Sequence, residues 1–347
     1  MAKQDIVLID GASGEGGGQI VRTSISLAMI TGRSLKLFNI RGNRKKPGLR
    51  PQHLTAVQAC ASVCGARVLG AELGAQELLF TPGKVRPGDY RFSIGTAGAA
   101  TLVLQTALPP LSKAEEESSV RVSGGTHVPW SPPYHYLKEV FLPTIELLGC
   151  KIEASLTSWG WYPKGGGELQ AVIKRPGPSV PSPLDQRFEL ARVTGISASS
   201  RLPKHVRVRQ KQRLQTRLHK VGIEAEITLM DVPAPNPGSF VFLCARGSES
   251  VAGFSSLGAR GKPAERVADG AVDDLLQFLD SGAALDPHLA DQIMVYLSML
   301  PGRHTFTTSS ITQHLLTNGW VIEQFLPVQF EIVGGLGGPG TVVKLDK

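Results

Sequence analysis

Cysteine is scarce in this chain. The 347 residues include only Cys60, Cys64, Cys150 and Cys244. Cys60 and Cys64 are one helical turn apart, a poor geometry for a disulfide, and no residues have the spacing of a zinc ligand set. The pattern therefore predicts buried thiols in a protein of a reducing compartment.

Long apolar runs are also absent. No stretch of 18 apolar residues occurs, so we expect no transmembrane helix and no membrane partner. The first residues contain an apolar core of only four residues, 6–9, before Asp10, and this does not fit a signal peptide. We therefore expect a cytoplasmic protein.

The composition nevertheless supports a folded protein with a substantial core. Hydrophobic residues make up 41% and charged residues 19%, which excludes disorder by composition. The glycines and prolines show no three-residue period, which excludes a collagen-like structure. The length fits two domains, or one large domain with an insertion. The net charge of +8 favours a polyanionic partner.

A helical pattern that ends at a glycine and continues into a strand recurs along the chain. The helices end at Gly65, Gly149 and Gly222, and an alternating strand follows each of them. This recurrence predicts a duplicated α+β unit. It covers residues 52–68, 136–156 and 210–229, after a first strand at 5–10 and a helix from Gln19 that stops at Gly32.

Two breaks in this pattern predict domain boundaries. Residues 175–186 (RPGPSVPSPLDQ) contain four prolines, which is typical of a linker, and residues 281–287 (SGAALDP) form a second break. We expect a main domain of residues 1–183 and 284–347 with an inserted domain of residues 184–283. The predicted fold class is α+β: repeated units of a small sheet with helices on one face, plus a smaller inserted α/β domain.

A glycine-rich loop, residues 11–22 (GASGEGGGQIVR), follows the first strand and opens a helix. Backbone amides and the helix dipole favour anions at such a place. The loop has neither the Lys-Ser/Thr pair of a Walker A motif nor the third glycine of a dinucleotide fingerprint. Glu15 inside the loop is unfavourable beside a phosphate unless a divalent cation lies between them. Arg22, one turn into the helix, would reach the same phosphates.

Acidic residues are missing from the long segment between Glu15 and Glu72. The loop RGNRKKPGLRPQH within it is strongly basic, which a solvated loop would also explain, but the missing acids favour a phosphate-bearing ligand. The basic side chains of this segment include Arg33, Lys36, Arg41, Arg44, Lys45, Lys46, Arg50 and His53.

A second acid-free segment runs from Leu190 to Gly222. No aromatic residue lies among its basic residues, so we expect a general phosphate-attracting face there and no base stacking. The basic residues of this segment include Arg201, Lys204, Arg207, Arg209, Lys211, Arg213, Arg217 and Lys220.

The histidines offer several candidates for chemistry. The neighbours of His205, His219 and His304 indicate surface positions, whereas His53 begins a helix directly after the basic loop, where a functional and a structural role are equally consistent. His314 lies in TFTTSSITQHLLTNGW, before a predicted turn at 318–319, and the residues alone favour a core histidine. Neither a Ser-His-Asp order nor a metal-ligand spacing accompanies it. The residues thus predict an anion-binding, metal-assisted enzyme.

Taken together, these segments resemble the RNA 3′-terminal phosphate cyclase family. Seven collinear stretches carry the resemblance, at 10–22, 40–57, 88–109, 123–133, 161–168, 288–292 and 313–318, and the predicted insert is the weakest match. The resemblance implies repeated α+β units and an inserted domain similar to the C-terminal domain of a translation initiation factor.

The resemblance also implies an activity, and it reverses the interpretation of His314. In the family, the histidine of the HLLTN motif attacks the α-phosphate of ATP and forms a covalent histidine-AMP. AMP then passes to an RNA 3′-phosphate, and the adjacent 2′-hydroxyl attacks the activated phosphate, giving a 2′,3′-cyclic phosphate and free AMP. A neutral imidazole is a suitable nucleophile for the first step. The chain is then a ligase, with His314 as its catalytic residue.

The same resemblance assigns the remaining site residues by position. Glu15 matches the metal ligand, with Mg²⁺ or Mn²⁺ as the expected ion. ATP and an RNA with a 3′-terminal phosphate are the implied partners. A homodimer is a separate expectation that the matched motifs do not carry. The ATP-contacting positions are Gln105, Pro132, Pro133, Tyr136, His288, Leu289, Ala290, Asp291 and Gln292. The positions that hold phosphates of ATP or of the RNA end are Arg22, Arg41, Arg44 and His53.

Two departures and two alternatives accompany this interpretation. His288 stands where many bacterial members have a tyrosine, and His127 replaces an Asp or Asn, which affects the details of the base pocket. A non-catalytic ribosome-assembly branch lacks the nucleophile, so His314, Glu15 and Arg44 argue against it. An enolpyruvyl-type transferase would require phosphoenolpyruvate and no ATP.

Overall fold

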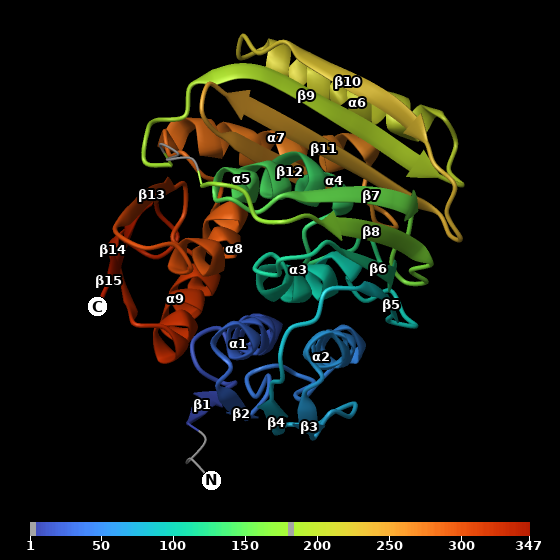
Figure 1. Ribbon diagram of the computed structural model, residues 1–347. Helices are drawn as coiled ribbons and strands as arrows, with labels where there is room; N and C mark the ends of the chain where they lie inside the picture. The colour runs from blue at the N-terminus through green and yellow to red at the C-terminus, as the bar shows by residue number, and fades with distance from the viewer. Residues whose placement is uncertain (1–4, 180–183) are drawn as a thin grey trace.

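The computed structural model describes residues 5–179 and 184–347, so residues 180–183 of the predicted linker lie outside it. Within this part of the chain, the secondary structure forms four small sheets with helices packed against them (Figure 1). This agrees with the predicted α+β class. The described residues include no helix that is long and apolar enough to cross a bilayer.

The first sheet and its helices form a β-α-β-α-β-β unit. Its strand order is β1-β2-β4-β3, with β1 and β2 parallel and the other pairs antiparallel. Gly32 and Gly65 follow its two helices in the left-handed conformation (φ 71° and 62°), as the sequence pattern predicts. The elements are β1 (Ile6–Asp10), α1 (Gly18–Thr31), β2 (Ser34–Phe38), α2 (Pro51–Cys64), β3 (Arg67–Leu69) and β4 (Leu78–Thr81).

The second sheet repeats this connectivity. Its order, β5-β6-β8-β7, again has one parallel pair followed by two antiparallel pairs. Its second helix is a composite of α4, a π-helical turn η1 and α5. The elements are β5 (Asp89–Ser93), α3 (Ala100–Leu111), β6 (Ser118–Gly124), α4 (Tyr134–Tyr136), η1 (Leu137–Phe141), α5 (Leu142–Leu147), β7 (Ile152–Ser158) and β8 (Gly167–Ile173).

The C-terminal sheet is a third copy of the unit with a reduced first strand. Its order, β13-β15-β14, matches the last three strands of the other two copies. In place of the first strand, Leu285 makes a single parallel bridge to Thr308. The elements are α8 (Pro287–Ser298), β13 (His304–Thr308), α9 (Gln313–Phe325), β14 (Val328–Gly334) and β15 (Gly340–Asp346).

The fourth sheet lies between the second and third copies in the sequence and has a different order, β10-β9-β11-β12, with a second apolar core under α6 and α7. The predicted third repeat, residues 210–229, falls here. It is therefore not a copy of the unit, because β10 pairs parallel with β9 at the sheet edge. The elements are β9 (Leu190–Ser200), α6 (His205–His219), β10 (Ala225–Asp231), β11 (Gly238–Gly247), β12 (Val251–Leu257) and α7 (Ala264–Ser281).

Helices of the three copies pack on one another between the sheets (Figure 1). Helix α1 contacts α3 and α9, and α2 contacts α3. Their apolar faces form one continuous core, which also encloses all four cysteines as free thiols, as predicted. The site described below lies among the beginnings of these helices.

The predicted turn at 318–319 is wrong, because α9 runs through both residues. Thr312 caps the helix by accepting a hydrogen bond from the Leu315 amide at 3.0 Å. Gly319 lies against α8, where an added Cβ would be 3.3 Å from Met294, so the glycine permits close helix packing. As a result, His314 lies in the first turn of a helix.

Candidate active site

The first turns of four helices are linked through side-chain contacts. His314 in α9 bonds Gln19 in α1, and His53 in α2 packs so closely on α1 that a Cβ on Gly18 would lie 2.1 Å from its Nε2. Gln52 in α2 accepts a hydrogen bond from the Ala99 amide, at the start of α3, at 2.9 Å. Unpaired amides and dipoles at helix N-termini favour anions, so this arrangement suits a polyphosphate.

Among the residues that the structure describes, the polar contacts of His314 involve one ring nitrogen, Nδ1, and leave Nε2 without a partner. Its Nδ1 lies 2.6 Å from Gln19 Oε1 and 3.0 Å from Glu15 Oε2. Gln19 is held in turn by Asp291, because Gln19 Nε2 donates to Asp291 Oδ2 at 3.3 Å. Both neighbours of Nδ1 are acceptors, so Nδ1 carries the proton and Nε2 keeps its lone pair.

The electrostatic surroundings keep His314 neutral. Partial burial, reinforced by the electrostatic effect of Arg22 and the other nearby basic side chains, lowers the pKa of His314 to about 4. The side chain is still 46% exposed, so a ligand has access to the ring. Burial raises the pKa of Asp291 to about 8, against the opposing effect of Arg22.

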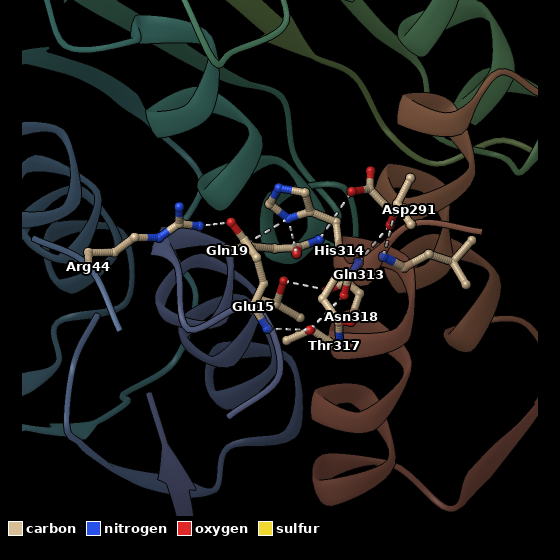
Figure 2. Close-up of polar contacts among 11 residues, drawn as sticks. Glu15, Gln19, Arg44, Asp291, Gln313, His314, Thr317 and Asn318 are labelled. Atoms are coloured by element: carbon tan, nitrogen blue, oxygen red, sulfur yellow. Dashed lines mark hydrogen bonds and ion pairs between the residues drawn. The ribbon is translucent and has the colours of Figure 1, made fainter. Parts of the chain in front are cut away.

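Glu15 lies between a cation and the imidazole. Figure 2 shows its carboxylate between the Arg44 guanidinium, which pairs with Oε1, and the His314 ring. The Glu15 amide donates to Thr317 Oγ1 at 3.2 Å, which fixes the loop to α9. A Cβ on Gly17 would fall 2.6 Å from Glu15 Oε2, so a side chain there would displace the carboxylate from this position.

The donor set around Glu15 suits a cation that also binds a nucleotide. Glu15 Oε2 is buried and accepts no hydrogen bond from the residues that the structure describes, since His314 Nδ1, 3.0 Å away, gives its proton to Gln19. The same part of the chain contains no group of three His, Cys, Asp or Glu side chains that would hold a metal. Mg²⁺ is commonly held by one or two carboxylates together with substrate phosphates, and a single available carboxylate fits that pattern.

A pocket beside His314 is lined by residues of α1, α3, α8 and α9, together with Phe141 of η1. Gln105 Nε2 donates to Gln292 Oε1 across it at 2.6 Å. Arg22 also lines the pocket, and burial lowers the pKa of Arg22 to about 10 against the opposing effect of Asp291. Arg22 therefore remains a cation at neutral pH and provides a charge for an anionic ligand.

The structure separates the predicted ATP-contacting residues into two groups. Gln105 and Gln292 line the pocket, Asp291 contacts Gln19, and His288 is exposed in the first turn of α8. The side chains of the second group pack into protein, and the Tyr136 hydroxyl donates to Asp286 Oδ1 at 2.8 Å. Because these side chains are buried, they contribute to the packing around the site. They belong to Pro133, Tyr136, Leu289 and Ala290, while the Pro132 carbonyl accepts from Thr101.

The predicted phosphate-holding residues also have distinct environments. Arg41 Nη1 donates to the carbonyls of Lys46 and Gly48 at 2.8 and 2.9 Å, so this nitrogen holds the basic loop together. His53 is buried, and burial together with the charges of Arg22, Arg41 and Arg50 lowers its pKa to about 3. Its Nδ1 accepts from the Arg50 amide at 3.2 Å. The ring is thus neutral, and its proton lies on Nε2, toward α1.

Helix α6 does not provide the phosphate-attracting face that its sequence predicts. Its arginines pair with acids of α7 and β10, which lie far away in the sequence, and these carboxylates neutralise the charge. The pairs are Arg207–Asp231, Arg209–Glu265, Arg213–Asp269 and Arg217 with Asp269 and Asp273.

Comparisons with known proteins identify the family. A family model described as RNA 3′-terminal phosphate cyclase matches residues 13–332. The chain belongs to the RNA 3′-terminal phosphate cyclase family. A cyclase of this name from Methylococcus capsulatus is 48% identical over 328 residues, 92% of this chain and 91% of the relative. Those from Pseudomonas fluorescens and Pyrococcus furiosus are 46% and 41% identical, over 95% and 97% of this chain and 95% and 98% of theirs.

Membership in the cyclase family confirms the resemblance carried by the seven motifs. It also places the chain among ATP-dependent ligases that act on RNA. Sequence reasoning missed Gln19, Thr317 and Asn318, although all three lie within matched motifs. Asn318 Nδ2 donates to the Asp291 carbonyl at 2.6 Å and its Oδ1 accepts from Thr23 at 2.7 Å, so it ties α9 to α8 and α1. The sequence signal that could have indicated Asn318 is a polar residue among the apolar residues of a helical pattern.

Proposed function

We propose that this chain is an RNA 3′-terminal phosphate cyclase whose nucleophile is His314 Nε2. The observation that carries the proposal is a neutral, accessible imidazole, with its Nδ1 proton bonded to Gln19, at a cluster of helix N-termini. A phosphate monoester is a poor electrophile, and adenylation gives it AMP as a leaving group. The histidine adduct supplies that AMP.

The reaction proceeds through three displacements at phosphorus. His314 Nε2 attacks the α-phosphate of ATP, a P–N bond forms, and pyrophosphate leaves. An oxygen of the RNA 3′-phosphate then attacks the histidine-AMP and releases the imidazole, giving RNA-(3′)pp(5′)-A. Finally the 2′-hydroxyl attacks the 3′-phosphorus, loses its proton and expels AMP, which leaves a 2′,3′-cyclic phosphate.

The residues around His314 have separate tasks in this scheme. Arg22, Gln105 and Gln292 bind the nucleotide in the pocket that they line. Arg44 and the Nε2 proton of His53 hold phosphate oxygens, whereas Arg41 Nη1 orders the basic loop. Glu15 Oε2 would hold a divalent cation, which would neutralise charge that develops on the α-phosphate and pyrophosphate. A cytoplasmic location and a homodimer remain predictions from the sequence.

The proposed function is tested with a single-stranded RNA that ends in a 3′-phosphate. With ATP and Mg²⁺, the end should become resistant to alkaline phosphatase, and AMP should be released in equal amount. A ribosome-assembly protein would bind the RNA and leave its end unchanged. Turnover with phosphoenolpyruvate and no ATP would instead indicate an enolpyruvyl-type transferase.

Gln19 acts as a positioning residue that fixes the tautomer of His314. Gln19→Met keeps the approximate side-chain shape but removes the acceptor for Nδ1 and the donor to Asp291. We expect the rate of adenylation to fall about 10- to 100-fold, the loss seen for residues that orient metal-binding histidines through the second ring nitrogen, with a smaller change in KM for ATP. Rapid-quench measurement of labelled protein checks this result.

A pH profile separates positioning from simple structural damage. Since the neutral imidazole attacks, adenylation by the native protein should decline only as pH falls toward about 4. Gln19→Glu retains an acceptor and adds a negative charge, which raises the pKa of His314 and moves this decline to higher pH. Native rates and an unshifted profile in both variants would show that Gln19 has no positioning role.

Arg44 and its neighbours Lys45 and Lys46 should respond differently to substitution. Arg44→Lys keeps the charge but loses the planar fork that grips two oxygens, so we expect a loss of turnover on the order of 10²-fold. Lys45 and Lys46 are exposed, and their double alanine variant should mainly weaken RNA binding, by a factor that shrinks as salt rises. Near-normal turnover of Arg44→Lys, with a salt-independent failure of the double variant, would reverse these roles.

A further inference from the structure

Trp130 is held in an unusual position on the surface. Its side chain is 98% exposed, and its backbone has a φ of 59°, in the left-handed region that bulky residues rarely adopt. The loop around it is nevertheless anchored. Ser131 Oγ donates to the Val128 carbonyl at 3.0 Å, and Thr101 Oγ1 donates to the Pro132 carbonyl at 2.8 Å. Such a backbone conformation persists where the surroundings enforce it, and an indole that is almost fully exposed is available to a ligand.

Three further loops continue from the Trp130 loop, each in contact with the one before it. His127 forms a parallel bridge with Trp161, which places the exposed Tyr162 (67% exposed) on the neighbouring loop. Asn236 of the insert donates to the Tyr162 carbonyl at 3.2 Å. Arg201 Nε, from the loop after β9, donates to the Ala234 carbonyl at 2.9 Å. In Figure 1, β7 and β9 end together, where β8 and β11 begin.

We name this set of loops, residues 125–133, 159–167, 200–204 and 232–238, the aromatic rim. Their sequences contain no Asp or Glu, whereas Lys164, Arg201 and Lys204 are exposed cations within them. The rim thus combines exposed aromatic rings with positive charge, the combination with which proteins bind single-stranded nucleic acid. Sequence reasoning excluded base stacking beside Arg201 and Lys204, because the aromatic residues come from distant segments.

The aromatic rim begins close to the active site. Thr101, which bonds the Trp130 loop, lies in the first turn of α3, and Gln105 of the nucleotide pocket lies one turn further along the same helix. A rise of about 1.5 Å per residue separates the two by about 6 Å along the axis. The first turn of α3 therefore joins the pocket to the Trp130 loop, which is the nearest part of the rim along this helix.

We propose that the aromatic rim binds the single-stranded RNA upstream of its 3′-phosphate, with a base stacked on Trp130. The inference rests on the proposed function, because it takes RNA as the substrate. Trp130 does not line the nucleotide pocket and is open to solvent, which favours an RNA base over the adenine of ATP. Lys164 and Arg201 contact the backbone phosphates, and the bases are held without sequence selection.

The test measures RNA binding directly, so that it does not depend on catalysis. A dye-labelled single-stranded RNA with a 3′-phosphate is titrated with the native protein, Trp130→Ala, Trp130→Phe and the control Trp320→Phe. Loss of one stacked base should raise Kd about 5- to 100-fold in Trp130→Ala, while Trp130→Phe retains most of the affinity. Trp320, which lies in α9 outside the rim, should have no effect. Binding should also quench the fluorescence of native protein much more than that of Trp130→Phe.

Two comparisons decide which base is stacked. An RNA with abasic nucleotides near its 3′ end should bind the native protein and Trp130→Ala equally, because the base that stacks is missing. Labelling by ATP in the absence of RNA should be unchanged in Trp130→Ala. A loss of ATP binding instead would assign the ring to adenine, and an unchanged RNA Kd would overturn the proposal. If native protein binds RNA through Trp130 but is never labelled by ATP, the proposed function fails and the aromatic rim stands.

Discussion

His314→Ala should lose adenylation and cyclisation of a 3′-phosphate RNA by at least about a thousandfold, since no other group replaces the attacking nitrogen. Gln19 and Asp291 bond each other without His314, and Arg22, Gln105 and Gln292 still line the pocket, so ATP binding should change little. The measurement compares protein labelling from α-labelled ATP with ATP affinity from calorimetry.

The same variant also separates the steps. An RNA that already carries AMP on its 3′-phosphate needs no histidine adduct, so His314→Ala should still cyclise it. If His314→Ala lost both adenylation and the cyclisation of RNA that already carries AMP, the substitution would disrupt the site as a whole. Retention of labelling in His314→Ala would assign the nucleophile to another residue.

Glu15→Ala should lower the rate of adenylation about 10²- to 10³-fold, the loss expected when an electrostatic contact to a developing charge is removed. ATP affinity should fall much less, because that charge is larger in the transition state than in bound ATP. Measurements of the single-turnover rate and of ATP Kd over a range of Mg²⁺ concentrations test this expectation.

Glu15→Gln is the matched control for the loop. Its amide retains the size of Glu15 and its backbone contact to Thr317, but it lacks the charge that a cation requires. It should therefore resemble Glu15→Ala in rate and the native protein in stability. Equal losses of rate and of ATP affinity in both variants would make Glu15 a structural residue of the loop.

Local signals in the sequence predict much of the fold. Glycines that end helices, such as Gly32 and Gly65, are visible because a left-handed residue has a strong preference for glycine. The third copy of the repeat escaped this reasoning, since α9 ends in an extended Leu326 without a glycine. The Asn-Gly pair at 318–319 has the composition of a turn, but in the helix Asn318 bonds Thr23 and the Asp291 carbonyl and Gly319 packs against α8, contacts that the local sequence does not display.

The site depends on contacts that span the chain, so residue patterns alone could not predict its geometry. His314 looks like a core histidine beside Leu315 because its partners, Glu15 and Gln19, lie about 300 residues earlier in the sequence. The resemblance to the family predicts His314 as the nucleophile, and the structure adds the hydrogen bond that occupies Nδ1 and, among the described residues, leaves Nε2 without a partner. The arginines of α6 show the opposite case, since their acidic partners lie in other elements and cancel the charge that the sequence displays.

The central claim is that His314 Nε2 carries AMP during the reaction. The direct measurement incubates native protein with α-labelled ATP and Mg²⁺ and no RNA, digests it under alkaline conditions and maps the label by mass spectrometry. We expect one labelled peptide, with AMP on His314 through a bond that is stable to base and labile to acid, and transfer of the label to a 3′-phosphate RNA when it is added. AMP on a lysine or on another histidine, or cyclisation without any labelled protein, would contradict the account.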